Sequence, residues 1–266
     1  DLYEYDVAAG TTVNLTESNK GYATNPSYSS TGALAWLSMK REGYESDKND
    51  LLVRAGGITT NLTQNWDESV QHYVWSNDGK KLYFTAAIDG TLQLFEVNYP
   101  GTPAVKQVTR GEFDITAIAG QSGNTMVVSR TDMNHAAEVY TVSLANGQLT
   151  QLTHVKDAAY AATSMSKVEK RMVTTTDGKQ MLVYVVYPPG FDPSKKYPTL
   201  LYCQGGPQSA LTQFYSFRWN LQLISGNGYI VVAPNRRGMP GHGVAWNEQI
   251  SKDHGGQVID DYLSAI

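Results

Sequence analysis

A short pattern recurs through the N-terminal part of the chain and restricts the fold more than any other feature of the sequence. A leucine or valine followed by threonine recurs at intervals of 47, 46 and 44 residues. A second marker, a turn glycine, keeps the same phase at Gly32, Gly79 and Gly123. Two markers in phase over three periods indicate a repeated structural unit. The four threonines are Thr16, Thr63, Thr109 and Thr153.

Each turn leads into stretches in which apolar and polar residues alternate, the pattern of a β-strand. The strands predicted in this way cover residues 33–39, 51–54, 81–86, 92–97, 125–130 and 138–144. Units of about 40–45 residues with four short strands are typical of propeller blades, and a β-sandwich with coincidental spacing is the alternative. We therefore expect residues 1–163 to form a partial β-propeller of about three blades, preceded by the tail of another. Because propellers close with about 4–8 blades, we expect the chain to begin inside a domain.

The pattern changes beyond residue 163. Asp177-Gly178 predicts a hairpin turn between strands at residues 171–176 and 181–187. Apolar strands at 199–203 and 229–233 flank five apolar residues at helical spacing, which predicts a strand–helix–strand crossover between parallel strands. These five residues are Leu211, Phe214, Phe217, Leu221 and Ile224.

A last helix is predicted near the end of the chain. Its apolar face consists of Ile259, Tyr262, Leu263 and Ile266, which we expect to be buried. Antiparallel strands that lead into parallel crossover units are the way an α/β-hydrolase sheet begins. We therefore expect residues 164–266 to be the N-terminal portion of an α/β-hydrolase domain.

Composition excludes several classes of function. The net charge of −4 leaves no basic surface for nucleic acid and no polybasic segment for a membrane. No apolar run approaches the roughly 20 residues that span a bilayer. Cys203 is the only cysteine, so the chain has neither an internal disulfide nor a cysteine-based metal site. Because His72, His135 and His154 show no ligand spacing, we expect no metal and no cofactor.

Two motifs follow the predicted parallel strands. Residues 202–209 read Tyr-Cys-Gln-Gly-Gly-Pro-Gln-Ser, and residues 233–243 read Ala-Pro-Asn-Arg-Arg-Gly-Met-Pro-Gly-His-Gly. With the repeats in front of them, they resemble the prolyl oligopeptidase family, in particular its acylaminoacyl-peptidase and dipeptidyl-peptidase-5-like branch of Bacteroides-type bacteria. The resemblance implies a periplasmic or secreted serine peptidase in which a propeller caps the site and admits short peptides. It is also compatible with a homodimer of the full-length protein.

The resemblance implies a Ser-Asp-His triad, whose serine would lie on a G-x-S-x-G elbow. The nearest match, Gly120-Gln121-Ser122-Gly123, has the wrong spacing and lies in a predicted blade turn. The strand that carries the nucleophile should follow the helix that starts near Gly256. We therefore expect the whole triad to lie beyond Ile266, and the chain alone to be inactive.

Gly205 and Gly206 follow a parallel strand, where α/β-hydrolases take one backbone N–H for the oxyanion hole. The resemblance favours Gly206 as the donor, and a tight turn without a chemical role is the alternative. Gln204 either donates to the oxyanion or orders the loop. Arg237 either contacts substrate or forms a structural ion pair, and we interpret His242 as structural.

A charged segment with one aromatic residue, 40–47, interrupts the first full blade. In dipeptidyl peptidases, acidic residues on the propeller bind the free amino group of the substrate. The resemblance therefore makes Glu42 and Glu45 candidates for the amine, with Arg41 for a peptide carbonyl and Tyr44 as a wall. The alternative is a solvated loop tip.

Three functions compete at this point. The first is a serine exopeptidase that removes dipeptides or acyl-amino acids from peptide N-termini. The second is a non-catalytic propeller that binds a partner, and the third is an esterase of the same hydrolase fold. The predicted oxyanion turn argues against a pure binding module, and the leading propeller argues against a simple esterase.

Overall fold

A computed structural model describes residues 1–206 and 208–266. Pro207, part of the Gly-Gly-Pro motif, lies outside the described residues. The chain begins with an antiparallel pair, β1 (Tyr3–Asp6) and β2 (Thr11–Asn14). This pair occupies the segment predicted to be the tail of a repeat.

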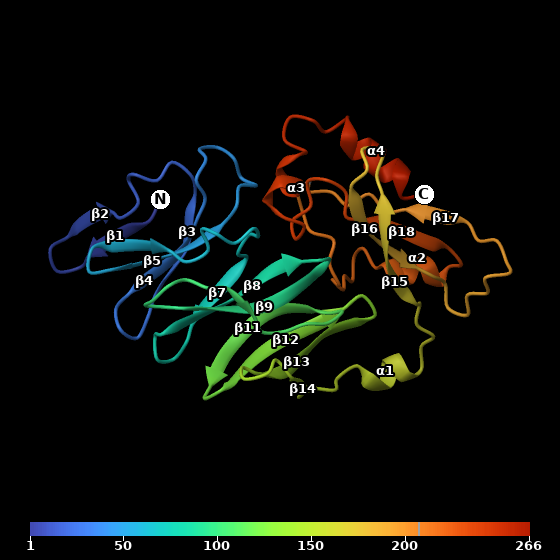
Figure 1. The fold of residues 1–266 in the computed structure, drawn as a ribbon. Coiled ribbons are helices and arrows are strands. Elements are labelled where there is room, and N and C mark those ends of the chain that lie inside the picture. The colour runs from blue at the N-terminus through green and yellow to red at the C-terminus, as the bar shows by residue number, and fades with distance from the viewer. Residues whose placement is uncertain (207) are drawn as a thin grey trace. The chain divides into compact units, whose positions relative to one another are not determined.

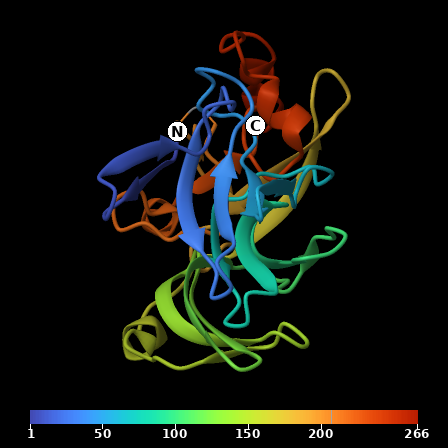
Figure 2. The same cartoon turned by 90° about the vertical axis from the view of Figure 1, so that its left-hand side faces the viewer.

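Three antiparallel sheets of four strands each follow, and neighbours along the chain are neighbours in the sheet. Figure 1 shows the strands of the third sheet, β11 to β14, in chain order, and Figure 2 shows the blue strands of the first sheet after a turn of 90°. The first sheet contains β3 (Ala23–Tyr28), β4 (Leu34–Ser38), β5 (Asp50–Ala55) and β6 (Ile58–Asn61). The second contains β7 (His72–Trp75), β8 (Lys81–Ile88), β9 (Thr91–Asn98) and β10 (Lys106–Gln107). The third contains β11 (Asp114–Ser122), β12 (Thr125–Asp132), β13 (His135–Ser143) and β14 (Leu149–Gln151).

The six strands predicted from alternation are confirmed, with bounds that differ by a few residues. The repeating threonine has a structural explanation in this arrangement. In the first sheet, Thr63 donates its hydroxyl to Asp50 over 3.1 Å and accepts the backbone N–H of Leu51 over 2.9 Å. Asn61 donates to the other oxygen of Asp50 over 2.9 Å. The threonine thus ties the end of a sheet's last strand to the start of its third.

The other repeats use the same device with different acceptors. The hydroxyl of Thr109 donates to Gln93 over 2.8 Å, and that of Thr153 donates to Glu138. Thr16 accepts the backbone N–H of Leu2 over 2.9 Å. We call each such threonine with its acceptor a threonine latch. A hydrogen-bonded threonine hydroxyl recurs in four equivalent places, buried at Thr16, Thr63 and Thr109 and half-buried at Thr153, which explains why this residue marks the period.

A further four-stranded sheet has the order β15–β16–β18–β17. Strands β17 and β18 are parallel, as predicted, and the other pairs are antiparallel. Alternate residues of β16 face opposite sides, so Leu182, Tyr184 and Val186 enter one apolar cluster while Met181, Val183 and Val185 enter another. The bounds are β15 (Val168–Thr174), β16 (Gln180–Val186), β17 (Thr199–Leu201) and β18 (Ile230–Pro234).

The predicted helix over residues 211–224 is wrong in its first part. Helix α2 covers only Leu221–Gly226 and begins where Asn220 accepts the backbone N–H groups of the second and third helical residues. Upstream, Ser216 accepts two backbone N–H groups in a turn, which interrupts a helical path. Leu211 is fully buried without belonging to a helix. Two short helices were not predicted, α1 (Asp157–Ala161) and α3 (Val244–Glu248).

The last helix, α4 (Gln257–Ser264), exists, but its predicted buried face is wrong. Ile259, Leu263 and Ile266 are exposed, whereas Val258 and Asp261 are buried. A polar contact explains which face of the helix is buried. Asp261 accepts the backbone N–H of Arg237 over 2.9 Å, which turns the side of α4 that carries Asp261 inward. A buried arginine that needs a carboxylate therefore sets the rotation of the helix.

The chain divides into two compact units. One comprises residues 1–86 with 94–108, and the other comprises 87–93 with 109–266. The predicted domain boundary between residues 163 and 164 stays a prediction. Among the described residues, no helix has both the length and the apolar character needed to cross a membrane.

Candidate functional site

The Gly205–Gly206 turn follows the carboxyl end of β17, as predicted. Gly206 has a φ of +129°, a conformation that side chains disfavour. A Cβ on Gly206 would lie 2.7 Å from the Cβ of Ser209, whereas one on Gly205 would meet nothing within 4 Å. Both glycines are exposed. The turn thus requires glycine at position 206 and presents bare backbone to the solvent.

The peptide group between Gln204 and Gly205, which precedes the turn, is held by hydrogen bonds to its carbonyl oxygen. The carbonyl oxygen of Gln204 accepts hydrogen bonds from the guanidinium of Arg236 and the hydroxyl of Tyr262, each over 3.3 Å. Arg236 is buried and also donates through Nε to the Tyr262 hydroxyl over 3.0 Å. Because C=O and N–H point in opposite directions across a trans peptide, this contact turns the N–H of Gly205 away from Arg236. The backbone of Gln204 thus has a supporting role in the loop.

Arg237 is buried between two carboxylates. Its guanidinium donates to Asp177 over 2.7 Å, and its Nε lies 3.4 Å from Asp261. The hydrogen bonds from Arg237 hold the pKa of Asp177 well below its usual value. Asp177 belongs to the hairpin turn predicted from the sequence. This geometry matches the structural ion pair, one of the two roles considered for Arg237.

The segment after the Gly205–Gly206 turn is held by a carboxylate that the sequence analysis did not single out. Asp114, at the start of β11, accepts the hydroxyl of Thr212 over 2.6 Å. It also accepts the backbone N–H groups of Leu92 over 2.8 Å and Gln213 over 3.2 Å. Burial raises the pKa of Asp114 to about 6, against the effect of these hydrogen bonds. No local signal marks this role, because its partners lie far along the chain.

His242 is an unsuitable general base. Its Nε2 is buried and has no hydrogen-bond partner among the described residues. Burial lowers the pKa of His242 to about 4, so the imidazole is neutral at pH 7. The ring lies edge-on to Trp246. These features agree with the structural role that we inferred for this histidine.

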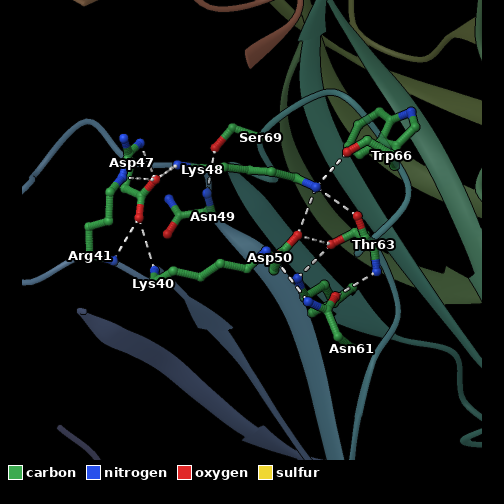
Figure 3. Close-up of polar contacts among 11 residues, drawn as sticks. Lys40, Arg41, Asp47, Lys48, Asn49, Asp50, Asn61, Thr63, Trp66 and Ser69 are labelled. Atoms are coloured by element: carbon green, nitrogen blue, oxygen red, sulfur yellow. Dashed lines mark hydrogen bonds and ion pairs between the residues drawn. The ribbon is translucent and has the colours of Figure 1, made fainter. Parts of the chain in front are cut away.

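The predicted amine-binding segment forms the loop between β4 and β5 (Figure 3). Glu42 and Glu45 are exposed, and Tyr44 is half-buried. The guanidinium of Arg41 lies 4.3 Å above the ring of Tyr44. Arg41 also donates to Asp47 through Nε over 3.1 Å and through a terminal nitrogen over 2.6 Å.

The base of this loop is a second polar network. The ammonium of Lys48 donates to the carbonyl oxygens of Thr63 and Trp66 and lies 2.8 Å from Asp50. Asp50 is also the acceptor of a threonine latch. Sequence reasoning missed Asp47, Lys48 and Asp50, although all three lie in or next to the charged segment. The burial of Asp47 and Asp50, which the sequence does not reveal, distinguishes them from the exposed glutamates.

The predicted site residues fall into two groups. Gln204, Gly205, Gly206 and Arg237 belong to the unit that contains residues 109–266. Arg41, Glu42, Tyr44 and Glu45 belong to the unit that contains residues 1–86. In the first group, Arg236 links Gln204 to Arg237 by hydrogen bonds to both carbonyl oxygens, and in the second group all four residues lie on one loop. Among the described residues, no cluster of three His, Cys, Asp or Glu side chains could hold a metal ion.

Two family models match the chain. Residues 1–181 match the N-terminal region of dipeptidyl peptidase IV, and residues 215–266 match the prolyl oligopeptidase family. The chain is 42% identical over 269 residues to dipeptidyl-peptidase 5 of Porphyromonas gingivalis, and 45% identical over 268 residues to that of Porphyromonas endodontalis. These alignments cover 100% of the chain but only 39% and 38% of the two relatives.

Solved structures show the same fold at low sequence identity. An acylaminoacyl peptidase of Pyrococcus horikoshii superposes with a TM-score of 0.82 at 19% identity, over 99% of the chain and 40% of that protein. Dipeptidyl peptidase 4 of Porphyromonas gingivalis gives a TM-score of 0.69 at 17% identity, over 93% of the chain and 36% of that protein.

Proposed function

Since this chain belongs to the prolyl oligopeptidase family of serine peptidases, we propose that it is part of a longer serine exopeptidase. The enzyme releases dipeptides, or acyl-amino acids, from the N-termini of short peptides. The observation that carries this proposal is the exposed Gly205–Gly206 turn at the end of a parallel strand, with a glycine required at position 206. Similarity to dipeptidyl-peptidase 5 along the whole chain supports the substrate class.

In this mechanism the N–H of Gly206 donates to the oxyanion that forms when a serine attacks the scissile carbonyl. One such donor lowers the barrier by about 2.7–4 kcal/mol, because it is already aimed at the developing charge. The sequence of the chain contains no G-x-S-x-G elbow. The Ser-Asp-His triad is therefore assigned to a part of the protein outside residues 1–266, and the chain alone is inactive.

The three four-stranded sheets are proposed to be blades of a propeller that caps the site. Their sequential strand order and the threonine latches support this assignment. A capping propeller restricts entry to short or unfolded peptides. The fold shared with an acylaminoacyl peptidase is consistent with it.

Glu42 and Glu45 are proposed to bind the free amino group of the substrate, and Arg41 a peptide carbonyl. Two exposed carboxylates on one short loop suit an ammonium group. Fixing the amine at a set distance from the nucleophile would place the cut after the second residue. Tyr44 would form a wall beside the substrate.

This proposal is tested with the full-length protein and dipeptidyl reporter substrates that carry a free or an acetylated amine. Glu45→Gln and Glu42→Gln should raise KM about 10-fold or more for free-amine substrates, because each removes a charge opposite the ammonium. Both should leave KM for acetylated substrates unchanged. Equal KM values for variants and wild type on both substrates would show that neither glutamate binds the amine.

A further inference from the structure

We propose that Asp47 is the positioning residue that holds Arg41 ready for substrate and keeps it away from the glutamates of the same loop. This inference rests on the proposed role of Arg41, Glu42 and Glu45. It concerns a residue that the sequence did not single out. Asp47 is a buried carboxylate in the loop between β4 and β5 (Figure 3).

Asp47 uses both carboxylate oxygens. Its Oδ2 accepts the backbone N–H groups of Lys40 over 2.9 Å and Arg41 over 2.8 Å. Its Oδ1 accepts Nε and a terminal nitrogen of Arg41, together with the backbone N–H of Lys48 over 2.9 Å. The carboxylate therefore joins both ends of the loop and one side chain. Although burial acts to raise it, these hydrogen bonds lower the pKa of Asp47 below its usual value, so it stays ionised at neutral pH.

Arg41 is held without being hidden. Asp47 contacts it from the buried side, with a side-chain exposure of 7%, while the side chain of Arg41 is 47% exposed. The ring of Tyr44 covers one face of the guanidinium. A guanidinium that is already ordered loses less rotamer entropy when it binds a carbonyl than a mobile guanidinium does. Asp47 thus prepares Arg41 for binding.

Charge gives Asp47 a second effect. Glu42 is next to Arg41 in sequence, and Glu45 is four residues away on the same loop. A released guanidinium would be drawn to these exposed carboxylates and would neutralise them. Because Asp47 already balances the charge of Arg41, the two glutamates keep their negative charge for the substrate amine.

The test uses full-length protein, with active enzyme counted by titration with a serine-directed phosphonate. Asp47→Asn should raise KM for free-amine dipeptidyl substrates about 10-fold and leave kcat per active site unchanged. Asp50→Asn is the matched control, because Asp50 is buried in the same region but pairs with Lys48, Asn61 and Thr63. It should lower the yield of folded protein and leave KM unchanged.

A double-mutant cycle with Arg41→Ala separates the inference from the proposed function. If Asp47 acts through Arg41, adding Asp47→Asn to Arg41→Ala changes KM no further. If Arg41→Ala raises KM and Asp47→Asn leaves KM normal, the positioning role of Asp47 is overturned, whereas the proposed carbonyl contact of Arg41 stands. Fully additive effects would also overturn it. A normal KM for Arg41→Ala would overturn the proposed carbonyl contact, and the inference with it.

Discussion

At the scale of single residues, the two glycines of the proposed oxyanion turn, Gly205 and Gly206, are not equivalent. Both look alike in the sequence, and both are exposed. Only Gly206 combines a positive φ with a close approach to Ser209. The motif thus predicted the turn, but the backbone was needed to show which glycine cannot be replaced.

Gly206→Ala in the full-length protein should therefore lower kcat by about 100-fold or more, because the added Cβ displaces an N–H aimed at the oxyanion. Gly205→Ala is the matched control and should stay within about threefold of wild type, since a Cβ there meets nothing within 4 Å. The measurement is kcat per titrated active site on a dipeptidyl reporter. A Gly206→Ala variant with normal kcat would reduce the turn to a purely structural feature.

Asp114 and His242 give the same unit opposite dependences on pH. The pKa of Asp114 is raised from 3.8 to about 6, so the folded state binds a proton that the unfolded state still releases. This group adds stability as the pH falls from about 6 to 4. The pKa of His242 is lowered from 6.5 to about 4, so the unfolded state binds the proton first, and stability is lost over nearly the same range.

The pH-dependent contributions of Asp114 and His242 to the free energy of unfolding should therefore nearly cancel in wild type. A variant that lacks one of the two groups should show the contribution of the other. Relative to wild type, Asp114→Asn should lose stability on acidification from pH 7 to pH 4, and His242→Gln should gain it, each by up to about 3 kcal/mol. The measurement is the difference in unfolding free energy between variant and wild type at several pH values. Parallel pH curves for all three proteins would contradict the assigned burial of both groups.

At the scale of elements, strands were predicted better than helices. Alternation is a local signal, and each repeated strand pairs with its neighbour in sequence, so pattern and structure agree. The helix prediction is wrong for the segment before α2, because Asp114 and Asn235 hold residues 211–213 by hydrogen bonds. The predicted buried face of α4 is wrong, because Asp261 turns inward to accept the backbone N–H of Arg237. In both cases, polar contacts with residues far along the chain decided the structure against the helical spacing of the apolar residues.

The threonine latch is an element-scale device that can be tested. Thr63→Val keeps the shape of the side chain but removes one hydrogen bond to buried Asp50 and leaves the N–H of Leu51 without its acceptor, which should cost about 1–3 kcal/mol. Hydrogen exchange of the β5 amides should accelerate by 10-fold or more. The control is Thr59→Val, at an exposed position of β6, where exchange should not change. Equal exchange in both variants would show that the latch adds no local stability.

At the scale of the whole molecule, similarity and structure contribute different parts of the account. The motifs of the last hundred or so residues indicated the family, and the matching family models agree. The buried carboxylates Asp47, Asp50 and Asp114 could not be identified in advance, because burial and long-range partners decide their roles. The chain spans 39% of the length of its Porphyromonas gingivalis relative.

In the proposed function, residues 1–266 supply an oxyanion turn to a serine nucleophile located elsewhere in the protein. The most direct test treats full-length protein with a serine-directed phosphonate and maps the adduct by peptide mass spectrometry while dipeptidyl hydrolysis is followed. The account predicts one adduct per molecule, on a serine outside residues 1–266, with hydrolysis lost in proportion to labelling. An adduct on a serine within residues 1–266, or hydrolysis that survives complete labelling, would contradict it.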